Sequence, residues 1–167
     1  MSATPTEQSG FSLLEVLVAS TVFSLGLAGL SAMLLLSFAG AADAERESNA
    51  ASAAASLAEQ LRLNPVALDR YLDPPDQITQ ICTGRNTCTP AQQADYDFRL
   101  WQLELANGVP GARALVCHDA TPEDGIEGNE HCDGTGSLVI KIFWQGSGHI
   151  RNGSQLPGQH RFVLTVS

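Results

Sequence analysis

Residues 16–42 form a run of 27 residues without a charged side chain. A helix needs only about 20 apolar residues to cross about 30 Å of hydrocarbon. Glu15 stands immediately before the run, and upstream lies a short polar leader that ends in Gly10 and is followed by Phe11. The sequence therefore predicts a membrane-spanning helix with one carboxylate near its start.

The apolar run does not have the layout of a cleaved secretory signal. Such a signal has a basic region, a shorter apolar region and then a small-residue cleavage site, in that order. Here the candidate cut, between Gly10 and Phe11, comes before the apolar run, and no obvious cleavage site followed by a domain start comes after Ala42. We therefore expect the run to stay on the mature protein.

The segment G-F-S-L-L-E-V-L-V-A resembles the class III signal of type IV prepilins and pseudopilins. This resemblance implies that prepilin peptidase cuts after Gly10 and methylates the new amino terminus, Phe11. It also implies that Glu15 pairs with the amino terminus of a neighbouring subunit in a filament, and a carboxylate in a membrane helix does usually need a partner. Glu15 would also suit the positive end of the helix dipole. The leader has neither Lys nor Arg, so the orientation in the membrane rests on the resemblance.

The length and charge of the chain limit its class. With 167 residues it has room for one anchor helix and one small domain. Its net charge is −9 and it has no basic cluster, which argues against a nucleic-acid-binding surface. The predicted segments are a leader removed at 1–10, a membrane or filament-core helix at 11–42, its amphipathic continuation at 43–64 and a periplasmic head at 65–167.

Two helices are predicted. No proline interrupts residues 11–64, and Pro65 marks the end of the long helix. The second half of this helix has an apolar stripe that should pack on the head: Ala50, Ala54, Leu57 and Leu61. Thr89 and Gln92 have capping-box spacing and begin a second helix that ends at Gly108, with one apolar stripe: Ala94, Phe98, Trp101 and Leu105. Residues 65–89 are interpreted as an irregular connection.

Three strands are predicted at residues 113–117, 138–144 and 161–166, which are rich in Val, Ile, Leu and Phe. Their order suggests an antiparallel meander, with a loose glycine-containing link between the last two. In the third strand, Phe162, Leu164 and Val166 should face the long helix. The predicted fold class is α+β, with a long amino-terminal helix packed on a small antiparallel sheet domain that also holds a second helix and disulfides.

The four cysteines, Cys82, Cys88, Cys117 and Cys132, all lie in the region expected to be periplasmic, where disulfides persist. Three connectivities are possible, and we favour the two local pairs, Cys82 with Cys88 and Cys117 with Cys132. The weaker alternative is a metal site made by Cys117, His118, His131 and Cys132, which lacks the paired short spacings of structural zinc sites.

The stretch from His118 to His131 is the most acidic of the chain. Asp119 and Glu130 have the first-to-twelfth spacing of a calcium-binding EF-hand loop, but Asp124 stands where that loop needs glycine. A solvated acidic loop is the favoured interpretation, with calcium as a minor alternative. No catalytic constellation and no phosphate-binding loop is visible, so we predict neither an enzyme nor a cofactor.

Within the prepilin superfamily the chain resembles the PilV-type minor pilins of type IV pili. The resemblance rests on F-S-L-L-E-V-L-V-A, C-T-G-R-N-T-C-T, A-D-Y-D-F-R-L-W, N-G-V-P-G-A-R-A-L-V-C and V-I-K-I-F-W. It implies a single-pass inner-membrane protein with a periplasmic head, which joins other minor pilins to prime pilus assembly and sits at the pilus tip, supporting twitching motility and surface attachment. The implied partners are prepilin peptidase, the other minor pilins, the major pilin and the inner-membrane assembly machinery. The alternatives are a minor pseudopilin of type II secretion and a membrane-anchored periplasmic adaptor that never assembles.

Overall fold

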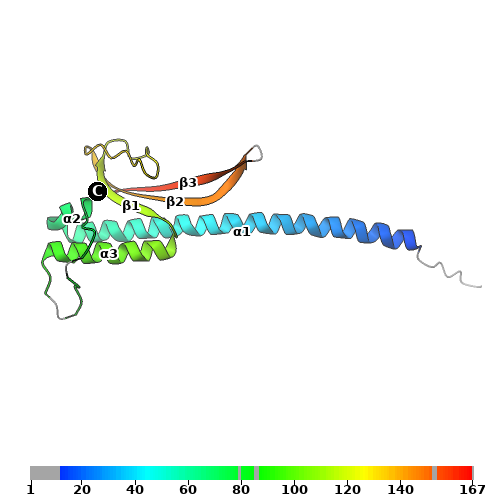
Figure 1. Cartoon of the computed structure of the whole chain (residues 1–167), viewed down its shortest axis with the longest axis horizontal. Coiled ribbons are helices and arrows are strands. Elements are labelled where there is room, and N and C mark those ends of the chain that lie inside the picture. Colours follow the sequence, from blue (N-terminus) through cyan, green and yellow to red (C-terminus); the bar gives the residue numbers. More distant parts are fainter. Residues whose placement is uncertain (1–11, 79, 85–86, 152–153, 167) are drawn as a thin grey trace, which may run out of the picture. The chain divides into compact units, whose positions relative to one another are not determined.

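The computed structural model describes residues 12–78, 80–84, 87–151 and 154–166. The chain divides into two compact units, one ending at Ala41 and one beginning at Ala42. The elements, in chain order (Figure 1), are α1 (Leu13–Leu63), the 3-10 turn η1 (Pro65–Ala67), α2 (Leu68–Leu72), α3 (Pro90–Gly108), β1 (Arg113–Asp119), β2 (Ser137–Arg151) and β3 (Ser154–Val166). The predicted α+β class is confirmed.

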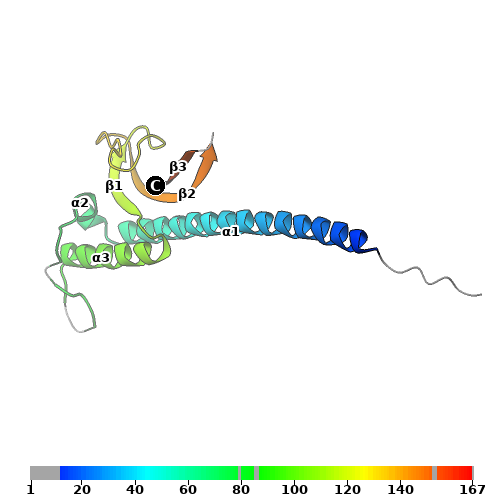
Figure 2. The ribbon, with the colours of Figure 1, turned by 45° about the vertical axis from the view of Figure 1, so that its right-hand side comes forward.

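Helix α1 has 51 residues and ends just before Pro65. Its buried positions all lie in the second unit and form the predicted stripe with one addition: Ala50, Ala54, Leu57, Ala58 and Leu61. Helix α3 runs alongside this part of α1 in both views (Figures 1 and 2). The Trp101 indole nitrogen of α3 donates to the Ala53 carbonyl of α1 at 2.7 Å. The alanines of the stripe allow this close approach because their side chains are short.

Helix α3 begins and packs as its sequence predicts. Thr89 and Gln92 form the reciprocal capping box, and the buried positions include all four residues of the predicted stripe. Asp95 is the buried exception, and its carboxylate accepts two hydrogen bonds from the Arg70 guanidinium, at 2.6 and 2.8 Å. Such a two-point contact fixes one helix against another, so it positions α2 on α3.

The interpretation of residues 65–89 as irregular is wrong for their first part, which forms η1 and α2. The cause is tertiary packing. Tyr71 of α2 is buried, and its ring meets the Phe98 ring edge-on at a centroid distance of 6.1 Å. A helix of five residues is too short to be stable by itself, so sequence periodicity gives little sign of it.

The sheet is an antiparallel meander in the order β1-β2-β3, as predicted. Its second and third strands are longer than predicted, because β2 and β3 stay paired from Leu138 and Val166 out to Arg151 and Ser154. Gly146 pairs with Gly158, and the register then shifts before His149. Gly146, which the prediction assigned to a loop, therefore lies within the paired strands beside a bulge.

Different parts of the chain pack against the two faces of the sheet. The face toward the helices contributes to the main core with α1 and α3, and Phe162, Leu164 and Val166 are on it, as expected. The other face is covered by the loop 120–136, drawn in yellow above the sheet in Figure 1. Gly136 (φ 78°) makes the end of this loop possible, because a Cβ there would lie 2.6 Å from the Cα of Ala120.

Candidate functional site

In the first unit, the surface of α1 is apolar on all sides. Its large apolar side chains from Leu13 to Phe38 have exposed fractions between 48% and 80%. Within the described residues this is the one helix that is long and apolar enough to span a bilayer. A helix surface of this kind is stable only when lipid or other apolar helices cover it.

The hydroxyl side chains of this segment form hydrogen bonds within the helix itself. Five hydroxyls, from Ser20 to Ser37, donate to backbone carbonyls three or four residues earlier, at 2.7–2.9 Å: those of Ser20, Thr21, Ser24, Ser31 and Ser37. A hydroxyl bonded in this way needs no partner from water. The segment can therefore enter hydrocarbon without leaving hydroxyl groups unpaired.

Glu15 lies in the first turn of α1, exposed, and its backbone N–H donates to the Ser12 carbonyl at 3.0 Å. Its side chain borders a shallow groove along the helix with Val16, Ala19, Ser20 and Phe23. No other carboxylate occurs before Asp43 in the part of α1 described. Gly10 and Phe11, the predicted cleavage and methylation residues, lie outside the described residues.

In the second unit, the loop 120–136 is fastened over the outer face of the sheet. A disulfide joins Cys117 of β1 to Cys132 of the loop. Arg161 of β3 donates to the carbonyls of Gly125, at 2.7 Å, and Glu123. Residues 120–131 are exposed or half-exposed, in line with a solvated acidic loop, but Asp119 is buried and cationic side chains of the sheet hold the loop in place.

Lys141 of β2 is completely buried beneath this loop and is surrounded by oxygen atoms. It forms an ion pair with the buried carboxylate of Asp119. Its ammonium also lies 2.9 Å from the Glu130 carbonyl and 3.3 Å from the Asp124 carbonyl, with the Asp124 carboxylate at 3.4 Å. The hydrogen bond from Lys141 and the backbone N–H of Thr121 together lower the pKa of Asp119.

These contacts bear on both metal alternatives. The carboxylate of Asp119, the first residue of the EF-hand-like spacing, is engaged by the Lys141 ammonium. Cys117 and Cys132 lie near Asp119 in a group that could hold a metal, but both sulfurs are in the disulfide and offer no thiolate. In the described part of the head, the loop is therefore organised by an internal ammonium and a disulfide.

The second disulfide joins Cys82 to Cys88, so the structure has both of the local pairs favoured from the sequence. The Cys82 sulfur lies 3.5 Å from the Gln92 carbonyl in the first turns of α3. The link therefore closes a short loop beside the start of this helix.

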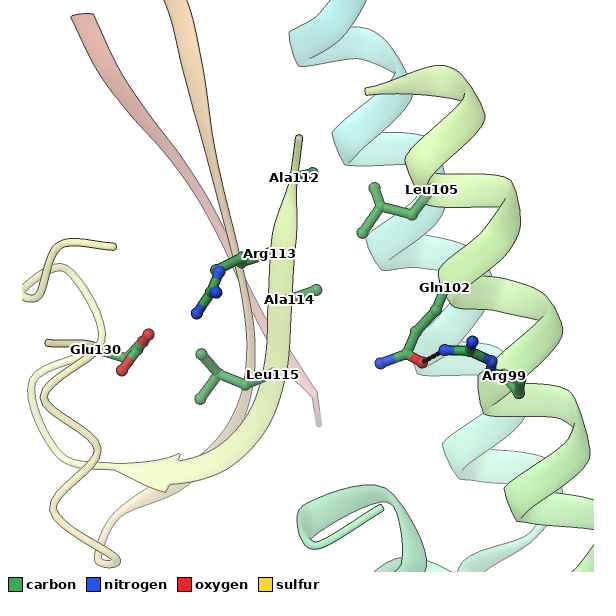
Figure 3. Close-up of a pocket in the computed structure, with 8 residues that line it drawn as sticks. All are labelled: Arg99, Gln102, Leu105, Ala112, Arg113, Ala114, Leu115 and Glu130. Atoms are coloured by element: carbon green, nitrogen blue, oxygen red, sulfur yellow. Dashed lines mark hydrogen bonds between the residues drawn. The ribbon is translucent and has the colours of Figure 1, made fainter. Parts of the chain in front are cut away.

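A groove of about 510 Å³ opens between α3 and the edge strand β1 (Figure 3). Ala112 and Ala114 point toward α3, where Arg99, Gln102 and Leu105 form the facing wall. Arg113 and Leu115 point to the other side of the strand, toward Glu130 of the loop, which also lines the groove. Its walls thus come from a helix, the backbone edge of a sheet and the fastened loop.

Comparison with known families decides between classes of membrane-anchored protein. The family described as the prokaryotic N-terminal methylation motif matches residues 6–31, and the family described as type IV pilin Tt1218 matches residues 32–99. No curated protein and no solved structure gives a significant match. The chain is a type IV pilin-like protein.

The type IV pilin family accounts for the features of both units. Pilins are structural subunits, in agreement with the prediction that the chain is not an enzyme. The methylation motif implies processing by prepilin peptidase and assembly into a pilus. The exposed apolar segment of α1 fits a membrane-anchored pilin.

Sequence reasoning missed the centre of this pilin-like head, the pair of Lys141 and Asp119. A signal was present, because Lys141 is the one charged residue in the apolar segment 138–144. Alternation places Lys141 on the same face as Val139 and Phe143, which are both buried. A charge between two buried positions of a strand calls for a buried partner of opposite charge.

Proposed function

We propose that this chain is a minor pilin of the PilV type, which joins other minor pilins to prime type IV pilus assembly and sits at the pilus tip. The observation that carries the proposal is Glu15 at the start of the exposed first half of α1, which has no other charge before Asp43. A lone carboxylate there has no partner within reach in its own apolar segment, whereas the amino terminus of a neighbouring subunit would supply one. In this role the protein supports twitching motility and surface attachment.

The mechanism follows from the surface of α1. The apolar segment is stored in the inner membrane and then transferred to a bundle of similar helices as the filament grows. This transfer replaces lipid contacts by helix contacts, so close packing and the pairing of Glu15 supply specificity more than hydrophobic burial does. Cleavage after Gly10 by prepilin peptidase frees the amino group of Phe11 as the cation for that pairing.

The first test is the intact mass and amino-terminal sequence of the protein from cells with and without prepilin peptidase. We expect a chain that begins at methylated Phe11 only when the peptidase is present. The variant Gly10→Val should keep its leader, because a bulky residue then precedes the scissile bond, and Ser9→Ala is the matched control. An unprocessed chain in both strains would instead favour the non-assembling adaptor.

The second test measures incorporation. Glu15→Ala should be processed as usual but recovered poorly from sheared filaments, and the neighbouring change Ser12→Ala should not reduce recovery. Normal recovery of Glu15→Ala would count against the pairing role. Co-recovery with the major pilin supports a pilus subunit, whereas co-recovery with a secretion pseudopilin moves the chain to type II secretion.

A further inference from the structure

Strand β1 is an edge of the head sheet, and near its end the His118 carbonyl accepts from the backbone N–H of Gly134 in the loop, at 3.0 Å. Among the described residues it pairs with β2 and with no other strand. In an antiparallel sheet every second residue of an edge strand directs its N–H and C=O away from its neighbour, where another strand can pair with them. The seven residues of β1 contain no proline, so no backbone donor is missing along it.

The opposite edge is less suited to pairing. Strand β3 contains Pro157, which has no N–H to donate, and proline on an edge strand is a common protection against strand addition. The two edges of the sheet therefore differ, and β1 is the one whose backbone is complete.

The groove beside β1 gives room for a fourth strand. It is bounded by α3 on one side and the backbone of residues 112–115 on the other (Figure 3). Ala112 and Ala114 are too short to fill the space toward α3, so the side chains of an added strand can occupy it. Residues alternate between the two faces of such a strand, and those on the helix side would meet Arg99 and Gln102.

The charges at the groove indicate the kind of strand that fits. Arg99 is exposed, and the contact described for its guanidinium is a hydrogen bond to Gln102 at 3.4 Å. Arg113 reaches Glu127 at 3.7 Å and is 70% exposed. Glu130 lies on the far side of β1 from Arg99 (Figure 3). Among the residues that line the groove, Arg99 is thus the charged side chain on the helix side, and it is a cation.

We propose that β1 accepts an extended segment of another filament subunit as a fourth strand, with an acidic side chain of that segment opposite Arg99. Main-chain hydrogen bonds would hold the segment, and the alternate side chains in the groove would select it. This inference rests on the proposed function, because the partner is a minor pilin. A second copy of this chain fits less well, since the side chains of its β1 that face the helices, Ala114 and Val116, offer Arg99 no acidic partner.

The test uses the full-length tagged protein, co-expressed with the other minor pilins in one membrane and purified in detergent. Backbone hydrogen exchange of residues 113–118 is compared for the complex and for the protein purified alone. We expect slower exchange in the complex, because the outward N–H groups of β1 become bonded to the added strand. Arg99→Glu should reduce the co-purified minor pilins by at least about tenfold, through loss of attraction and gain of repulsion.

Arg62→Glu is the matched control. It makes the same change of charge on a half-exposed helical arginine that does not line the groove, and the partner described for it is Glu59 at 3.7 Å. Recovery of the minor pilins with Arg62→Glu should equal that of the wild type.

The outcomes separate the two proposals. A stable complex with unchanged exchange in β1, or equal losses for Arg99→Glu and Arg62→Glu, overturns strand addition and leaves the minor pilin role intact. Failure to co-purify any minor pilin removes both. The protein alone is also measured at high concentration. If hydrogen exchange in β1 then slows and β1 of one copy crosslinks to β1 of another, the chain self-associates, and this result also overturns the proposal.

Discussion

Helix α1 has two different surfaces along one unbroken stretch of backbone. Up to Ala41 its large apolar side chains are exposed on every side, and no charge follows Glu15. From Ala42 onward the buried side chains form one stripe, in which three of the five residues are alanine. The first half is thus suited to contact on all sides, and the second half to contact along one line.

The difference shows how side-chain size and charge select the neighbour of a helix. Short side chains in the second half allow α3 to come close enough for Trp101 to bond the backbone of Ala53, at 2.7 Å. The second half also carries charges outside its stripe, which remain hydrated. The first half needs a cover that is apolar all round, which lipid or other pilin helices provide.

The head treats charge in yet another way. It buries the ammonium of Lys141, but only together with the carboxylate of Asp119 and backbone carbonyls of the covering loop. A membrane offers no such oxygens to residues 16–42, where charge is absent. The head interior and the surroundings of residues 16–42 therefore differ in the partners that they offer to a charged side chain.

The largest effect is expected from a charge placed in the first half of α1. Leu27→Asp adds a carboxylate near the middle of the apolar segment, at a cost of about 3 kcal/mol for insertion. We expect most of this variant to be lost from membranes washed with alkaline carbonate, as measured by immunoblotting of the pellet.

The matched variant is Ser52→Asp, on the exposed side of the second half. It should leave the membrane-bound fraction unchanged, because this position contacts water in the head. Equal behaviour of the two variants would show that the halves do not differ in environment, and the comparison would fail.

The next effect is a loss of packing in the second half. Leu57 is fully buried, so Leu57→Ala should lower the free energy of unfolding of the head by about 3 kcal/mol. This corresponds to a drop in Tm of about 10 °C for a domain of this size. Trp101 and Trp144 are both buried in the head, and their fluorescence reports the transition in detergent.

Leu34→Ala makes the same deletion in the first half, where the side chain is 58% exposed. It should leave the Tm of the head unchanged, since it removes no contact from its core. A comparable drop in Tm for Leu34→Ala would mean that the first half also supports the head.

How much of this could be predicted from sequence depends on the range of the interactions. The stripe of α1, the capping box at Thr89 and the order of the strands are set by local spacing and were predicted correctly. Helix α2 and the burial of Lys141 depend on residues far along the chain, and single-sequence periodicity does not contain them. The predicted β2–β3 hairpin is too short because Gly146 and Gly148 suggest a loop, whereas Gly146 pairs with Gly158 and the strands continue beyond a bulge.

A smaller effect is expected from removing the buried cation. Lys141→Met keeps the length of the side chain but leaves the Asp119 carboxylate without its counter-charge. We expect the Tm to drop less than it does for Leu57→Ala. The reason is that the loop 120–136 can open and hydrate the carboxylate while the core stays packed. Faster hydrogen exchange confined to this loop is the measurement that identifies local opening.

Gln145→Met is the control for this change, since Gln145 is an exposed residue of the same strand that donates to Glu127 of the same loop, at 2.8 Å. Its exchange pattern should match that of the wild type. If Lys141→Met also leaves the loop protected, the disulfide and the contacts of Arg161 hold the loop without the ammonium, which then has no ordering role.

The smallest effect concerns pH. The hydrogen bond from Lys141, followed by that from the Thr121 backbone, lowers the pKa of Asp119 in the folded head. A lowered pKa stabilises the folded state above the unfolded value of about 3.9, and this contribution is lost as the pH falls through the lower folded value. The Tm of the wild type should therefore decline below about pH 4.

Asp119→Asn should have a lower Tm at neutral pH and a shallower decline on acidification. Asp133 needs its own control, because hydrogen bonds from Thr135 lower its pKa as well, so Asp133→Asn is measured in parallel. Equal acid slopes for the wild type and Asp119→Asn would contradict the assignment. If the Tm declines less steeply on acidification for Asp119→Asn but not for Asp133→Asn, a paired charge stabilises the head. Residues 16–42 contain no such charge.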